Sequence, residues 1–163
     1  MRRLVRFTLS VAALMFAVFL VAAGAAENGA MRPWRGTWSG ELTIIGNCEG
    51  SALLIVENGI GYMEHMGRTG WYNKYCLDPV TWTATSENAV ETAANGDEIH
   101  VRTSLQVIWT SATSGNWIET ETVISGTGRF SAAKGVSHTG GTFSFTTPTK
   151  AVWEGTTTGM LSY

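Results

Sequence analysis

The chain has 163 residues, of which 44% are hydrophobic and 15% are charged, with a formal net charge of -2 at pH 7. Its 19 glycines, 7 tryptophans and many threonines are typical of a β-rich domain. Three of the eleven Lys and Arg residues lie in the N-terminal leader, so eight remain against thirteen Asp and Glu residues. This acidic balance speaks against nucleic acid and anionic membrane surfaces as partners, because phosphate binding requires clustered Lys and Arg side chains.

Residues 1–26 have the three-part pattern of a secretory signal peptide. Arginines precede an uncharged apolar run over 7–21, which ends in the small residues 22–26. The run is barely long enough to cross a bilayer, which takes about 20 residues, so an uncleaved membrane anchor is the less economical alternative. We therefore predict a single domain over 27–163 that is secreted or periplasmic and free of the membrane once the signal is removed.

Two cysteines, Cys48 and Cys76, remain in a chain predicted to leave the reducing cytoplasm. One structural disulfide is the economical interpretation, and it should stabilise the fold by about 3 to 4 kcal/mol. The alternative is a redox or metal pair. No Cys-x-x-Cys spacing exists and no histidine lies within a few residues of either cysteine, which favours the disulfide.

The first half of the domain shows strand patterns with one markedly longer loop. Residues 37–45 alternate, with Trp38 on the apolar face, and predict a strand with one wet side. A second apolar run over 51–56 is followed by Asn58-Gly59, the strongest short-range hairpin signal, and then by residues 60–66.

Residues 67–79 mix Gly, Trp, Tyr, Asn and Lys, and we interpret them as a long loop held by the disulfide. Strand character returns over 80–85, around Trp82. After a tight turn at 95–97 comes the cleanest alternation in the chain. One face of that segment is apolar apart from a threonine and consists of Ile99, Val101, Thr103, Leu105, Val107 and Trp109.

The second half predicts three further strands, over 117–124, around 143–145 and from 151 to the end, with a glycine-rich segment over 126–141. No sustained helical periodicity follows the leader. About eight short strands in sequence order favour an all-β fold, a single antiparallel β-barrel or a sandwich. The barrel is preferable because it leaves no exposed strand edge, and its interior is either filled or holds one small ligand.

The segment Gly126–Gly135, GTGRFSAAKG, resembles the G-T-G-[RK]-F-x-x-A-x-G signature of dirigent proteins and the allene oxide cyclase barrel-like superfamily. The segments at 64–68 and 93–97 resemble secreted bacterial members of the same group. The signature departs at Ser125, where many members carry another glycine. The resemblance implies an eight-stranded barrel of the allene oxide cyclase, dirigent or lipocalin type, with an apolar cavity that needs no cofactor. Physically, the motif is architectural, and Phe130 can plug one end of the barrel.

Several polar side chains are candidates for chemistry. Glu98, His100 and Arg102 share one strand face, which is either a cavity wall or, since the opposite face is apolar, the solvated exterior. Glu64 and His65 are adjacent in a strand and so point to opposite faces. His138 lies in a loop, and three scattered histidines predict no metal site.

Aromatic side chains carry the strongest functional signal. Six of them, from six predicted strands, are expected either to fill the barrel or to line a ligand pocket: Trp38, Tyr62, Trp82, Trp109, Trp117 and Trp153.

Three hypotheses follow. The leading one is a barrel that binds a small hydrophobic molecule. The second is a cofactor-free isomerase or cyclase, which requires a cavity containing an acid or base, namely Glu98, His100, Glu119, Glu121 or His65. The third is a structural or interaction barrel with a filled core, which leaves no cavity.

Overall fold

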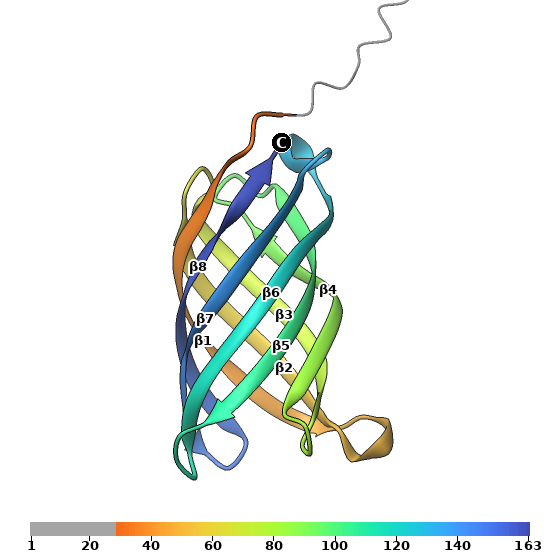
Figure 1. Cartoon of the computed structure of the whole chain (residues 1–163), viewed down its shortest axis with the longest axis vertical. Coiled ribbons are helices and arrows are strands. Elements are labelled where there is room, and N and C mark those ends of the chain that lie inside the picture. Colours follow the sequence, from red (N-terminus) through yellow and green to blue (C-terminus); the bar gives the residue numbers. More distant parts are fainter. Residues whose placement is uncertain (1–28) are drawn as a thin grey trace, which may run out of the picture.

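Buried and more exposed side chains alternate along most of each strand of residues 29–163, the part of the chain that the computed structural model describes. Eight antiparallel strands, each paired with its neighbours in the sequence, close into a barrel (Figure 1). The prediction of an all-β, eight-stranded antiparallel barrel is therefore confirmed. The strands are β1 (Arg32–Asn47), β2 (Leu53–Met63), β3 (Gly67–Asp78), β4 (Thr83–Thr92), β5 (Glu98–Trp109), β6 (Ser114–Gly126), β7 (Lys134–Thr147) and β8 (Lys150–Ser162), with two short 3-10 turns, η2 (Glu49–Ser51) and η3 (Gly128–Phe130).

The predicted signal peptide over 1–26 lies outside the described residues. Within 29–163, no helix is long and apolar enough to cross a membrane.

β2 corrects the hairpin predicted at Asn58-Gly59. The strand runs through both residues without a break, and Gly59 pairs with Gly40 of β1. The turn comes later, between β2 and β3, where His65 has a φ of 66°. Gly59 is required for space: a Cβ atom there would lie 2.6 Å from Cη2 of Trp153, so the glycine admits an indole ring and makes no turn.

β3 corrects the long loop predicted over 67–79. Buried and exposed residues alternate along β3 as in any strand. Two of its five buried residues, Thr69 and Asn73, are polar. The polar residues hid the alternation, because a pattern search expects the buried face of a strand to be apolar.

Two other boundaries also differ from the prediction. Trp82 lies in the turn before β4, with a φ of 57°, and β4 extends from there to Thr92. β7 begins at Lys134, so His138 belongs to a strand and the glycine-rich loop is shorter than predicted. The β8 strand from residue 151 and the clean alternation of β5 are as expected.

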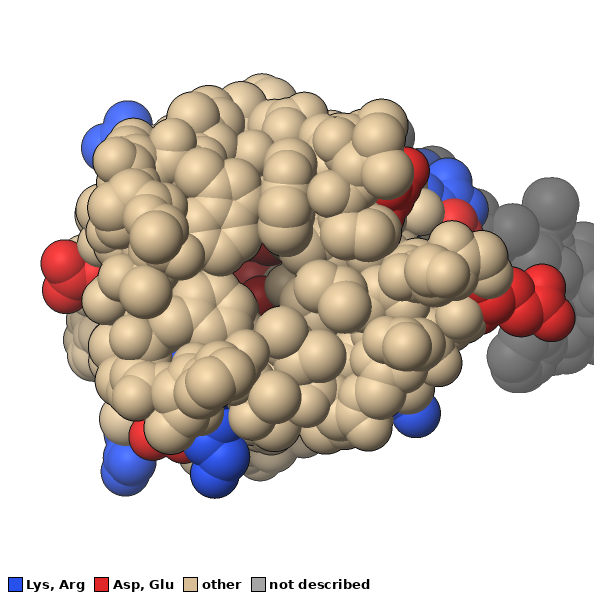
Figure 2. All heavy atoms as spheres, turned by 90° about the horizontal axis from the view of Figure 1, so that it is seen from below, with Lys and Arg blue, Asp and Glu red and all other residues tan. Residues whose placement is uncertain are grey.

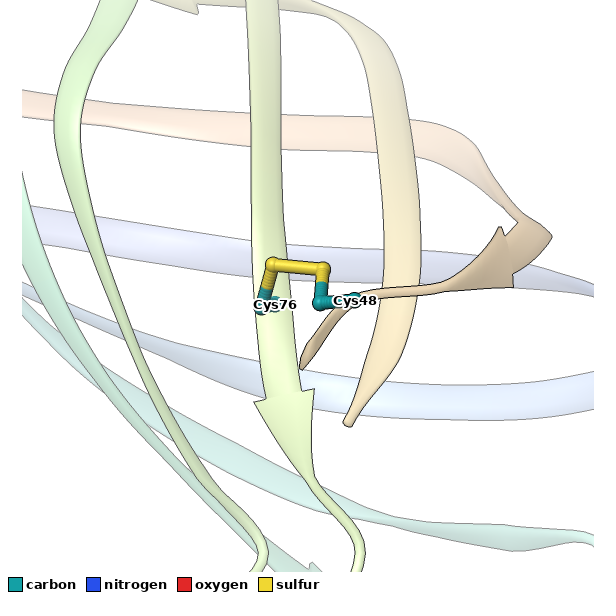
Figure 3. Close-up of a disulfide and its surroundings, with 2 residues drawn as sticks. All are labelled: Cys48 and Cys76. Atoms are coloured by element: carbon teal, nitrogen blue, oxygen red, sulfur yellow. A yellow bond between two sulfur atoms is a disulfide. The ribbon is translucent and has the colours of Figure 1, made fainter. Parts of the chain in front are cut away.

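The disulfide between Cys48 and Cys76 is confirmed (Figure 3). It joins the connection after β1 to the outward face of β3, with the two Cα atoms 6.1 Å apart. The pair anchors the β1–β2 connection to the barrel wall.

One end of the barrel is closed by fully buried side chains. Trp34, Met63, Ile99 and Phe130 come from β1, β2, β5 and η3, and none of them has any exposed surface. The Phe130 ring packs edge-on against Tyr163, with ring centroids 4.9 Å apart. As predicted, the glycine-rich motif places Phe130 as a plug, and any cavity must open at the other end.

Candidate functional site

A cavity of about 520 Å³ opens at the barrel end opposite the Phe130 plug. Figure 2 looks into this end and shows uncharged residues around the opening, with acidic side chains visible in its depth. Residues 112–113, between β5 and β6, and residues 146–148, at the end of β7 and the start of the next turn, contribute to the rim. Because a filled core leaves no such space, the cavity speaks against the filled-barrel hypothesis.

Apolar side chains form the rim of the cavity and the walls next to its opening. Trp109 is at the centre of an aromatic group: its ring lies 5.0 Å from that of Trp82 and 5.1 Å from that of Phe143, both edge-on. Phe145 stacks on Trp109 at 5.9 Å. The aliphatic lining residues are Leu42, Ile44, Leu53, Ile55, Leu77, Leu105 and Val107.

The structure places five of the six predicted aromatic residues in the cavity lining: Trp38, Trp82, Trp109, Trp117 and Trp153. The placement of Tyr62 was wrong, since it points outward and is 69% exposed. A turn at residues 58–59 would have reset the alternation, whereas the unbroken β2 strand fixes it from Ile55 onward.

Glycines on the inner wall keep the cavity open. A Cβ atom at Gly59 would meet the Trp153 ring at 2.6 Å, and one at Gly155 would meet the Trp117 ring at the same distance. The two indoles therefore lie close against bare backbone. A side chain at either glycine would push a ring towards the space that a ligand would use.

Glu57 of β2 is the first of three carboxyl groups in the cavity lining. Its carboxyl accepts a hydrogen bond of 2.5 Å from the Tyr75 hydroxyl and a longer one, 3.4 Å, from Nε1 of Trp71. Burial raises the pKa of Glu57, and the two hydrogen bonds oppose this rise. Burial and the nearby Glu57 charge also raise the pKa of Tyr75 well above its ordinary value.

Glu119 and Glu121 are neighbours on the inner face of β6. Glu121 accepts hydrogen bonds from the hydroxyls of Ser137, at 2.6 Å, and Thr139, at 2.8 Å. Burial raises the pKa of Glu121, and these bonds counteract it. Glu119 has its pKa raised well above the ordinary value, first by burial and then by the charge of Glu121.

A fourth carboxyl, Glu91 of β4, is fully buried but outside the cavity lining. Neither of its oxygens makes a hydrogen bond of good geometry within residues 29–163, although the Trp34 N–H is near enough to favour the ionised form, and the Asn73 amide on the adjacent strand has no partner there either. Burial, reinforced by the charge of Glu121, raises the pKa of Glu91 well above its ordinary value. The polar interior is thus larger than the cavity itself.

No cation balances these four glutamates. Every Lys and Arg within residues 29–163 is exposed, and none of the three histidines is buried. Carboxyl groups that are desolvated together cannot all be ionised at low cost, so burial favours the protonated form of this group. The site therefore combines an apolar mouth with carboxyls of raised pKa in its depth.

The other candidates for chemistry lie outside the cavity. Glu98, His100 and Arg102 face the exterior, where His100 contacts Glu98 at 3.1 Å. His65, in the β2–β3 turn, is exposed, as is its neighbour Glu64. His138 points outward from β7, 3.2 Å from the Thr120 hydroxyl. Among the described residues, no group of three or more His, Cys, Asp or Glu side chains is arranged to hold a metal ion.

Sequence reasoning missed Glu57, Tyr75 and Glu91, although it named Glu119 and Glu121. Glu57 stands next to the supposed turn at Asn58, and Tyr75 stands in the supposed loop. Counting alternate residues back from Met63 would have placed Glu57 inside the barrel, had β2 been recognised as one strand.

The comparisons with known proteins bear on the fold. No family model matches the chain, and no curated protein sequence matches it. Among solved structures, the chain is similar to that of a pterocarpan synthase dirigent protein, with a TM-score of 0.55 over 83% of this chain and 92% of the other. The two sequences are 10% identical over this match. The match shows that the barrel has the fold of that dirigent protein, which is the fold that the resemblance of the glycine-rich segment implied.

Proposed function

We propose that the protein binds a small, largely apolar molecule inside the barrel. The observation that supports this most directly is an open cavity of about 520 Å³ whose mouth is aromatic and whose depth holds Glu57, Glu119 and Glu121. Such a site buries an apolar body against tryptophan and phenylalanine rings, while a few polar groups fix the orientation of one polar end.

We further propose that binding takes place outside the cytoplasm, in a secreted or periplasmic protein. Two features support this location: the leader pattern over 1–26 and the Cys48–Cys76 disulfide, since disulfides persist mainly in oxidising compartments.

The test uses the neutral fluorescent probe N-phenyl-1-naphthylamine. Its emission should rise on binding, and Trp109→Ala should weaken binding about tenfold, because that ring is the centre of the rim aromatics. Tyr62→Ala removes an aromatic ring from the outer surface and is the matched control, with binding unchanged. Absence of binding to the wild-type protein, together with no molecule co-purifying in native mass spectrometry, would refute the proposal.

A second candidate function is cofactor-free acid catalysis of an isomerisation or cyclisation. The specific observation is Glu57, which lines the cavity and is paired with Tyr75, and whose pKa is raised by burial. A raised pKa favours the protonated carboxyl, which can donate its proton to a bound substrate. Glu57→Gln should abolish conversion of a co-purifying ligand to an isomer of equal mass, while the variant still binds the ligand.

A further inference from the structure

The inner face of the barrel carries acidic groups without a basic group to balance them. Its titratable groups are Glu57 from β2, Tyr75 from β3, Glu91 from β4, and Glu119 and Glu121 from β6. The inner faces of β1, β5, β7 and β8 contribute none. A neutral ligand would leave this imbalance as it is, whereas a positively charged one would remove part of it.

Indole rings border the same carboxyls. Trp71 donates its N–H to Glu57, and the Trp38 ring lies 6.1 Å from the Trp71 ring. Trp117 and Trp153 form a second pair, edge-on at 6.0 Å, and line the cavity with them. The faces of indole rings attract cations, and sites for ammonium groups in proteins are commonly built from aromatic rings beside carboxylates.

Glu91 gives an independent indication. Its side chain is fully buried, and neither of its oxygens makes a hydrogen bond of good geometry within the described residues, with the Trp34 N–H as a weakly favourable neighbour. Because Glu91 and Glu121 interact electrostatically, the group of unbalanced carboxyls extends beyond the cavity lining. A cation held at the floor would lower the electrostatic cost for every member of this group.

We infer that the ligand of this cavity carries a protonated amine, whose apolar body contacts the aromatic rim and whose ammonium group lies among Glu57, Glu119 and Glu121. The inference rests on the proposed binding function and specifies its ligand class as apolar amines. Binding then favours the ionised carboxylates, so the complex releases protons that the empty site holds.

The experiment compares three probes with one skeleton: 4-butylbenzylamine, 4-butylbenzyl alcohol and 4-butylbenzoate. Tryptophan fluorescence titrations of the full chain should show the amine binding about tenfold tighter than the alcohol, and the carboxylate weakest. Calorimetry in two buffers of different ionisation enthalpy should show proton release for the amine and none for the alcohol.

Two variants locate the effect. Glu121→Gln keeps one oxygen that can accept from Ser137 or Thr139, while its NH2 group can donate to the other hydroxyl, and it should reduce the preference for the amine over the alcohol. Glu154→Gln changes an exposed carboxyl on β8 and should preserve it. Should Glu121→Gln fail to fold, proton release by the wild-type protein decides the question.

The outcomes separate the two proposals. Equal affinity for the amine and the alcohol, or tightest binding of the carboxylate, would overturn the amine inference and leave apolar ligand binding in place. An amine preference that persists in Glu121→Gln and in Glu57→Gln would also overturn it. Failure of all three probes and of N-phenyl-1-naphthylamine to bind would instead overturn the proposed function.

Discussion

The two ends of the barrel contain similar aromatic residues that differ in burial. At the closed end, Trp34 and Phe130 are fully buried and surrounded by Met63 and Ile99. At the open end, Trp109 and Phe145 are only partly buried, and they line the cavity. An aromatic side chain stabilises the fold in proportion to the contacts that its neighbours supply, so the closed end contributes more to the stability of the barrel, while the open end leaves aromatic surface uncovered.

Truncating the Phe130 plug should cause the largest loss of stability, and so tests the difference between the two ends. Phe130→Ala should lower the free energy of unfolding by about 3 to 5 kcal/mol, because it leaves a void among side chains that are themselves fully buried. Urea unfolding followed by circular dichroism measures the change. Phe145→Ala is the partner variant at the open end and should cost less stability but weaken probe binding. Equal losses of stability at both ends would contradict the comparison.

Removing the disulfide should have the next largest effect. The bond closes a segment of 28 residues at the open end, where no packed plug holds the β1–β2 connection. Changing Cys48 and Cys76 together to serine should lower the free energy of unfolding by about 3 to 4 kcal/mol on the chain-entropy account. Unfolding of the oxidised and mutant proteins gives the difference. Two free thiols in the mass spectrum of exported protein would show that the bond is absent in the cell.

Filling an inner-wall glycine should have a smaller effect that reaches both stability and binding. In Gly59→Ala the new methyl group would meet the Trp153 ring at 2.6 Å, so the ring must move. We expect a loss of about 1 to 3 kcal/mol in unfolding free energy, together with weaker binding of N-phenyl-1-naphthylamine.

Gly70→Ala is the matched control for Gly59→Ala. Its added Cβ would lie 3.9 Å from the nearest atom, the Cβ of Thr92, which is an ordinary contact distance. Stability and binding should both stay close to those of the wild-type protein. If Gly70→Ala were as harmful as Gly59→Ala, the cost would come from the strand backbone and not from the displaced indole.

Strands with an apolar inner face could be predicted from the sequence, whereas strands with polar residues on the inner face could not. β5 was predicted residue by residue because its inner face is almost wholly apolar. β3 was missed because Thr69 and Asn73 break the apolar pattern, and their burial depends on strands that lie far away in the sequence. Glu57 was missed for a related reason: Asn58-Gly59 favours a turn locally, and only the approach of the Trp153 ring explains the glycine. The polar interior, on which the proposed function depends, was therefore the hardest part to predict.

The effect that is smallest per unit of the variable changed concerns the pH dependence of stability, which separates the buried carboxyls from the surface ones. Burial raises the pKa of Glu91, so the folded protein keeps a proton in a pH range where the unfolded chain has already released it. The free energy of unfolding must then fall as the pH rises above the ordinary pKa of 4.5, by at most about 1.4 kcal/mol per pH unit for one carboxyl. Glu91→Gln has no proton to lose at this position and should flatten the dependence, whereas Glu154→Gln on the outer surface should leave it unchanged. Urea unfolding between acidic and neutral pH measures both slopes. An unchanged slope in Glu91→Gln would mean that the remaining interior carboxyls, and not this one, hold the titrating protons.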